Sequence, residues 1–227
     1  MKKRLLSIIL TLCMVMSITP LNAFAVTEYG IWIGDEQVPS DKTWSKQGWR
    51  YDIQSKTLTL LGYNMATIGK RINGNSERPS RFGLIYVEGE QDLNIKLVGS
   101  IDLGDSPFSS QAATKYNESY SGIYAPDSNI TIIGSGTFSA VTHDAAIYCS
   151  NLTIGDGTEQ NATNVSCESF GACIIVKYNM IVNDYSTVWA CANGPTVGMN
   201  GIYVEGSLYV NGTNTTVEGR ATYRPVK

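Results

Sequence analysis

The sequence is poor in charged residues and nearly lacks histidine, and both shortages reduce the range of functions that the protein can have. Charged side chains make up 16% of the 227 residues, below the usual quarter, and His143 is the only histidine. No Cys-X-X-Cys pair, nucleophile elbow, phosphate loop or cofactor fingerprint occurs. These absences argue against a zinc site, redox chemistry, a bound cofactor and the common kinds of enzyme. An exposed loop explains the pair His143 and Asp144 better than a catalytic site does.

The sequence has one long apolar run, which lies at its start and resembles an export signal. Three basic residues at positions 2–4 precede apolar residues from 5 to about 18, and Ala-Phe-Ala follows, ending at Ala25. This arrangement predicts a secretory signal peptide over residues 1–25, cleaved after Ala25. The alternative, an uncleaved anchor helix, needs roughly 20 apolar residues without a small-residue exit site. We therefore expect a secreted, extracellular or surface-associated protein with no membrane segment after cleavage.

Cleavage would leave an acidic chain. Loss of the three basic residues changes the formal charge from −3 to −6. A secreted acidic protein is a poor match for nucleic acid, so no nucleic-acid partner is expected.

A pattern similar to Gly-Ile-Tyr returns five times along the chain. Its isoleucines stand at spacings of 38, 24, 27 and 28 residues and are Ile85, Ile123, Ile147, Ile174 and Ile202. A second alternating apolar and polar segment follows each pattern, at 93–97, 130–132, 152–154, 180–182 and 208–210. A third follows at 100–103, 137–140, 164–167, 187–190 and 216–219. Three short strands per repeat are therefore predicted, joined by turns rich in glycine and asparagine.

This recurrence, together with 22 glycines and few charges, predicts an all-β single domain. A meandering antiparallel sandwich would not restart the same strand at such intervals. In a right-handed parallel β-helix, each coil returns the chain to the same place one strand spacing higher, so equivalent residues stack. We predict a right-handed, single-stranded parallel β-helix of about five to six coils, with the five isoleucines in one buried column.

Strand phase also predicts where the cysteines lie. Cys149 and Cys167 align with inward positions of neighbouring coils, so we expect buried thiols. Cys173 and Cys191 lie at strand margins, where the phase does not decide between free thiols and a bridge joining adjacent coils.

The chain divides into a signal peptide (1–25), an N-terminal cap with the first coil (26–65) and the remaining coils (66–227). The cap segment is irregular and rich in tryptophan and tyrosine. Because an open β-helix end exposes core and unpaired backbone, we interpret these aromatic residues as the core of a cap, with a binding role as the alternative. Few residues follow the last strand, so we expect either association through the C-terminal end, giving an oligomer, or a truncated relative.

The outward positions of the predicted first strands form an aromatic column about 4.8 Å apart per coil. Its members are Tyr86, Tyr124, Tyr148, Ile175 and Tyr203. Two positions further on, at an outward position or at the edge of a turn, stand Glu88, Asp127 (after a one-residue insertion), Ser150, Lys177 and Glu205. Aromatic faces beside carboxylates suit a sugar, although stacked tyrosines also stabilise a sheet by themselves. The candidate carbohydrate-binding residues are Tyr86, Tyr124, Tyr148, Tyr203, Glu88 and Glu205.

A polysaccharide lyase or hydrolase on this fold would need carboxylates clustered on adjacent coils, to hold Ca²⁺ or to act as acid and base. Ser150 and Lys177 interrupt the acidic positions, so neither catalysis nor a metal site is expected, and no cofactor is assigned. A basic segment offers a different contact, with acidic sugars such as uronates, through Lys70, Arg71, Arg78 and Arg81.

Several of these segments together carry a family resemblance. They are the signal ending in Ala-Phe-Ala, Tyr-Gly-Ile-Trp-Ile-Gly at 29–34, Trp-Arg-Tyr-Asp at 49–52, Thr-Leu-Thr-Leu at 57–60 and the Gly-Ile-Tyr coils. They resemble secreted parallel β-helix surface proteins of Gram-positive gut bacteria, which are similar to pectate-lyase-like and carbohydrate-binding β-helices. The resemblance spans nearly the whole mature chain and implies surface adhesion or glycan binding. No catalytic residue of such families matches a position here.

The leading functional hypothesis is an exported, non-catalytic glycan-binding or adhesin-type module, with a polysaccharide or another glycan as its partner. Two alternatives stand beside it. One is a structural cell-surface stalk without a ligand, and the other is an enzyme similar to polysaccharide lyases or hydrolases.

Overall fold

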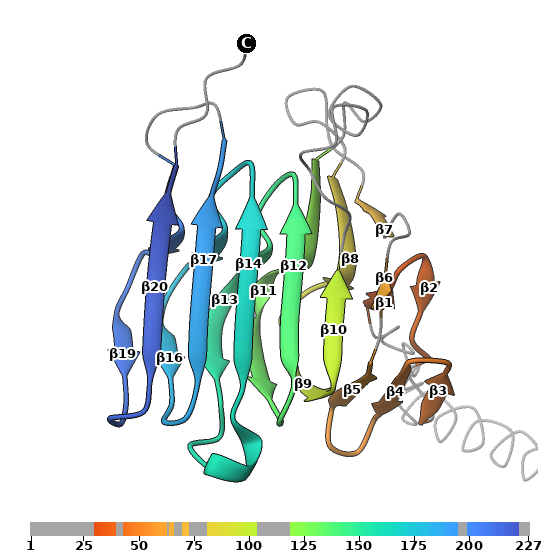
Figure 1. Ribbon diagram of the computed structural model, residues 1–227. Helices are drawn as coiled ribbons and strands as arrows, with labels where there is room; N and C mark the ends of the chain where they lie inside the picture. Colours follow the sequence, from red (N-terminus) through yellow and green to blue (C-terminus); the bar gives the residue numbers. More distant parts are fainter. Residues whose placement is uncertain are drawn as a thin grey trace, which may run out of the picture.

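The computed structural model describes residues 30–39, 43–62, 64–65, 70–72, 81–103, 119–194 and 199–222, and the predicted all-β fold is confirmed. Figure 1 shows two layers of strands facing each other, which we call sheet A, with 14 strands, and sheet B, with 6. The only helical element in these ranges is a short 3-10 turn, Glu159–Asn161. None of the described segments forms a helix long and apolar enough to cross a membrane. The predicted signal segment lies outside the described residues.

Successive repeats add strands first to sheet A and then to sheet B. In sheet A these are β8 (Arg81–Val87) with β9 (Asp92–Val98), β11 (Ser119–Ile133), β13 (Ile147–Ile154), β15 (Ile174–Val176) with β16 (Met180–Val182), and β18 (Ile202–Val204) with β19 (Leu208–Val210). In sheet B they are β6 (Asn64–Met65), β10 (Ser100–Leu103), β12 (Thr137–Thr142), β14 (Asn164–Ser169), β17 (Thr187–Ala192) and β20 (Thr216–Ala221). Each of these strands pairs in parallel with its equivalent in a neighbouring repeat.

The first two strand segments of a repeat share sheet A, and in two repeats they merge. The sequence predicts three separate strands, but β11 and β13 each run through the first two segments. The register between them shifts between Ala125 and Asn129, so residues 126–128 form an irregular step opposite Ser150. The chain stays in the sheet because its backbone pairs with β13 both before and after this step.

The repeats stack in the register that the isoleucine spacing predicts. Each isoleucine is the direct partner of the next one, in the order Ile85, Ile123, Ile147, Ile174 and Ile202. The first four are 0% exposed, whereas Ile202 is only partly buried, because its repeat has a paired neighbour on one side alone among the described residues. Stacking in one column is therefore confirmed, and complete burial holds for all members but the last.

All four cysteines in the described part of the chain are buried free thiols. Cys149 points into the core from sheet A and Cys167 from sheet B, as their strand phase predicts. The bridge between Cys173 and Cys191, one of two alternatives from the sequence, is not formed. Burial raises the pKa of the Cys149 and Cys173 thiols, because a thiolate would lose its hydration in the apolar core.

One predicted turn from sheet A to sheet B depends on glycine, since two repeats approach closely there. Gly134 has φ +105°, and a Cβ on it would lie 2.4 Å from the Leu97 carbonyl oxygen of the preceding repeat. A Cβ on Gly136 would lie 2.5 Å from the carbonyl oxygen of Gly99. Any larger residue at either position would push the two repeats apart.

Antiparallel strands lie at the N-terminal end of the parallel repeats. One group is β1 (Ile31–Ile33), β2 (Glu36–Gln37) and β7 (Lys70–Ile72), of which β1 and β7 run antiparallel to β8. The other is a meander of β3 (Trp44–Lys46), β4 (Trp49–Asp52) and β5 (Thr57–Leu61), whose last strand pairs in parallel with β9. Trp49 and Tyr51 are 2% and 0% exposed, so these two rings belong to the core.

Two adjacent isoleucines on β15 test the assignment of inner and outer faces. Ile174 is 0% exposed and stacked between Ile147 and Ile202, whereas Ile175 points outward. Ile174→Ala should lower the free energy of unfolding by about 2–5 kcal/mol, through lost apolar burial and the cavity left behind. Ile175→Ala should lower it by about 1 kcal/mol or less. Urea denaturation of both variants measures the difference, and equal losses would show that the two faces were assigned wrongly.

Candidate functional site

An outward-facing row of mostly aromatic side chains crosses sheet A, and we call it the aromatic stripe. Direct strand partners link Tyr86 to Tyr124, Tyr124 to Tyr148, Tyr148 to Ile175 and Ile175 to Tyr203, as the sequence predicts. β1 extends the row at its N-terminal end. The complete stripe is Trp32, Tyr86, Tyr124, Tyr148, Ile175 and Tyr203.

Trp32 is the member that repeat spacing does not find. It lies opposite Tyr86 because β1 runs antiparallel to β8, outside the parallel repeat. The only signal in the sequence is local: Ile31-Trp-Ile33 alternates apolar, aromatic and apolar residues as Ile85-Tyr-Val87 does. This alternation predicts the face on which the tryptophan lies but not its neighbouring strand.

The three tyrosines in the middle of the stripe contact one another. The ring centroids of Tyr86 and Tyr124 lie 6.1 Å apart with planes inclined at 34°, and those of Tyr124 and Tyr148 lie 5.4 Å apart at 67°. Both separations fall within the range of favourable aromatic pairs. Tyr203 is 43% exposed and separated from Tyr148 by Ile175, so it does not extend this run of touching rings.

A polar hollow of about 790 Å³ begins two to three residues beyond the tyrosines, where the first two strand segments of a repeat meet. At about 3.3 Å per residue, this places its edge roughly 7–10 Å along the strands from the rings. The lining residues are Lys56, Glu88, Gly89, Glu90, Gln91, Asp92, Asp127, Asn129, Ser150, Asn151 and Tyr178. Of the six candidate residues from the sequence, Glu88 lines the hollow, whereas Glu205 lies on the last repeat and is not among the lining residues.

A ladder of amides runs along one side of the hollow. The Asn129 side chain donates to Asp92 Oδ1 at 2.8 Å, and the Asn151 side chain donates to Asn129 Oδ1 at 2.7 Å. The ladder continues beyond the hollow, where the Asn179 backbone amide donates to Asn151 Oδ1 at 3.0 Å. Side chains at equivalent positions therefore hold one another in place, so these polar groups present a fixed surface.

The residues that follow the tyrosines, placed by the sequence at an outward position or at the edge of a turn, differ in their surroundings. Ser150 is 7% exposed, and its hydroxyl donates to the Pro126 carbonyl at 3.0 Å, because the step in β11 brings that carbonyl beside it. Lys177 therefore reaches past Ser150 to Asp127, with 2.9 Å between Nζ and Oδ1. The same ammonium lies 5.7 Å from the centre of the Tyr148 ring. This contact ties the stripe to the edge of the hollow.

Negatively charged side chains outnumber positively charged ones in the hollow, and their charge affects a tyrosine of the stripe. Glu88, Glu90, Asp92 and Asp127 line it, against the single lysine Lys56. Burial raises the pKa of Tyr86, and the negative charges of Glu88 and Asp127 raise it further. The hydrogen bond to Asp127 raises the pKa of Lys177. No cluster of three or more metal-ligating side chains occurs among the described residues.

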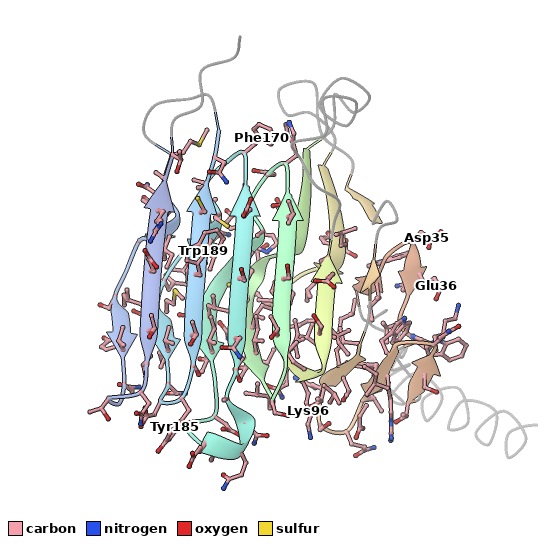
Figure 2. The ribbon with its side chains drawn as sticks, in the orientation of Figure 1. Asp35, Glu36, Lys96, Phe170, Tyr185 and Trp189 are labelled. Atoms are coloured by element: carbon pink, nitrogen blue, oxygen red, sulfur yellow. The ribbon has the colours of Figure 1, made fainter. Side chains whose placement is uncertain are left out.

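Other sequence candidates lie away from the stripe and the hollow or are not described. His143 packs beside Phe170, with 5.5 Å between ring centres, beyond the end of β14 in sheet B (Figure 2). Arg78 lies outside the described residues, and of Lys70, Arg71 and Arg81 the structure describes the backbone only. The proposed contact of these four basic residues with uronates therefore stays a prediction.

The raised pKa of Tyr86 predicts how alkaline pH affects stability. The unfolded chain ionises this tyrosine near pH 10, earlier than the folded chain does, so stability from Tyr86 is present below about pH 10 and lost as pH rises through the folded pKa. Tyr86→Phe removes this loss. Urea denaturation between about pH 9 and pH 11 should show wild type losing stability relative to the variant. Tyr178→Phe, which alters an exposed ring, is the control. If wild type loses as much stability relative to this control as it does relative to Tyr86→Phe, a specific role for Tyr86 is contradicted.

We compared the chain with protein-family models, curated proteins and solved structures, and none of them matches it. The geometry of the aromatic stripe and the polar hollow is therefore the basis for assigning a function.

Proposed function

We propose that the chain is a secreted right-handed parallel β-helix whose aromatic stripe and polar hollow bind a polysaccharide or another glycan without catalysis. Five repeats whose strands pair in parallel and in register support a helical coil. The right hand follows from the general rule that connections between parallel strands are right-handed. The predicted signal peptide supports export.

The observation that carries the binding proposal is the run of three touching tyrosines beside a polar hollow. A sugar ring has apolar C–H faces that pack on aromatic rings and hydroxyls that need hydrogen-bond partners. Tyr86, Tyr124 and Tyr148 supply the first, and Lys56, the carboxylates and the amides of the hollow supply the second. Because the strands hold both at fixed spacing, the surface is organised before any ligand arrives.

The charge of the hollow favours a neutral sugar or an amino sugar. Four carboxylates face one lysine there, and Asp127 is already paired with Lys177 at the edge. A uronate would meet net repulsion, whereas hydroxyl and ammonium groups would find acceptors. We therefore expect oligomers of glucose or glucosamine to bind more tightly than oligomers of galacturonic acid.

The carboxylates of the hollow suit binding better than glycoside cleavage. Asp92 accepts the Asn129 amide and Asp127 is paired with Lys177, while Glu88 and Glu90 are exposed. A general acid in a glycosidase is commonly a carboxyl group in an apolar pocket, which keeps it protonated near neutral pH. None of these four occupies such a pocket.

A double substitution in the stripe tests glycan binding. Each stacked ring should contribute on the order of 1 kcal/mol beyond its area burial, so Tyr124→Ala with Tyr148→Ala should weaken binding about thirtyfold. Isothermal titration with neutral, glucosamine and galacturonic acid oligomers gives the dissociation constants. Trp189→Ala is the control, because Trp189 lies on β17 of sheet B (Figure 2) and its loss should leave affinity unchanged.

A second pair of variants covers the case in which the double alanine variant fails to fold. Glu88→Gln and Glu90→Gln alter exposed side chains of the hollow and keep their size, so they should weaken binding while thermal unfolding stays unchanged. Affinity equal to that of the wild type in all these variants would show that the glycan binds elsewhere on the protein. No binding of any glycan by the wild type would leave the ligand-free stalk as the function.

A further inference from the structure

The last described repeat exposes apolar side chains that earlier repeats bury. Leu208 and Val210 on β19 are 45% and 49% exposed, whereas their direct partners Met180 and Val182 on β16 are 0% exposed. In the part of the chain that the structure describes, no strand pairs with the outer edges of β18, β19 and β20. Apolar surface beside unpaired strand edges is where another chain adds its strands.

The two ends of sheet B differ in what they offer to a partner. At the far edge, β6 has only two residues, and β1, β3 and β4 lie antiparallel at that end of sheet A. A copy docked head to tail would therefore give β20 almost nothing to pair with. A copy that presents its own β20 offers six residues. Like edges meeting give a closed two-fold dimer, whereas unlike edges give an open filament.

Strand phase and charge together select one register for two paired β20 strands. Inward residues must face inward residues, because a slip of one position turns every side chain to the other face. Among the registers that satisfy this, one centred on Gly219 places Glu218 of each copy opposite Arg220 of the other. A register centred on Glu218 or on Arg220 places like charges opposite each other, and one centred on Val217 pairs neither charge.

The charges in question are available for such a contact. The Glu218 and Arg220 side chains are 42% and 62% exposed, and they pair with each other within one copy. They stand two residues apart on one face of β20. Two such pairs meeting across a two-fold axis form four alternating charges.

We propose that two copies of this chain form a two-fold dimer in which their β20 strands pair antiparallel around Gly219. Sheet B then continues from one copy into the other, and the unpaired backbone groups of β20 find partners. Val217 of each copy lies opposite Ala221 of the other on the inner face. This contact is independent of the glycan-binding proposal, because it uses none of the residues of the stripe's touching rings or of the hollow.

Charge reversal tests the dimer through its oligomeric state. Sedimentation velocity of the purified chain over a dilution series should show a monomer–dimer equilibrium. Glu218→Arg places arginine opposite arginine, and Arg220→Glu places glutamate opposite glutamate, at both symmetric contacts. Each single variant should raise the dissociation constant of the dimer about tenfold or more. Thermal unfolding of the monomeric fraction verifies that the variants are folded.

Two further measurements separate a specific register from a general loss of association. The double variant Glu218→Arg with Arg220→Glu restores opposite charges at every contact and should regain the wild-type dissociation constant. Mixing the two single variants should give a heterodimer, because each arginine of one chain then faces a glutamate of the other.

Three results would overturn the proposal. The first is a wild-type chain that stays monomeric throughout the dilution series. The second is a dimer that neither single variant weakens. The third is association that the single variants abolish but that neither the double variant nor the mixture restores, since this excludes the register around Gly219.

Discussion

Parallel, in-register pairing of successive repeats is the constraint on which the rest of this structure depends. Because each strand from β8 onward lies beside its equivalent, many side chains have the same kind of residue on the neighbouring repeat. Buried isoleucines consequently stack on isoleucines, asparagines form hydrogen bonds with asparagines beside the polar hollow, and tyrosines contact tyrosines on the outer face of sheet A. The core, the amide ladder and the aromatic stripe are therefore three results of a single backbone arrangement.

The most informative places are those where this pairing is interrupted. At the step in β11, one extra stretch of backbone brings the Pro126 carbonyl to Ser150, and Lys177 bonds past that serine to Asp127. The hollow lies beside the same step, since Asp127 and Ser150 line it. At the N-terminal end, antiparallel strands replace the repeat and add Trp32 to the stripe. At the other end, burial falls from 0% exposure at Val182 to 49% at Val210, and the strand edges have no partner among the described residues.

The sequence predicted the features that recur in every repeat, and it did not predict those that arise where the repeat is interrupted. Isoleucine spacing predicted the register, and alternation predicted that Cys149 and Cys167 point inward, because both follow from equal neighbours on adjacent strands. Alternation alone did not decide whether Ser150 lies at an outward position or at the edge of a turn. The structure buries it beside Cys149, because the inward phase of β13 shifts by one residue opposite the step in β11. Trp32 escaped prediction because antiparallel pairing places it opposite Tyr86, outside the repeat. The hollow escaped prediction because repeat spacing gives the register of the segments that line it, but not the shape of the space between their side chains.

The symmetry of the proposed dimer determines how the two proposed glycan-binding surfaces are arranged. A two-fold axis that relates antiparallel β20 strands stands perpendicular to sheet B. The outer faces of sheet A in the two copies therefore point in the same direction. The aromatic stripes of the two copies would consequently lie on the same face of the dimer, running in opposite directions from the joint. A long polysaccharide carries many equivalent sugar units, so it could engage both stripes, and the second contact would be intramolecular. Modest affinity at each run of touching tyrosines would then suffice for firm attachment to a polymer, whereas short oligomers would bind each copy separately.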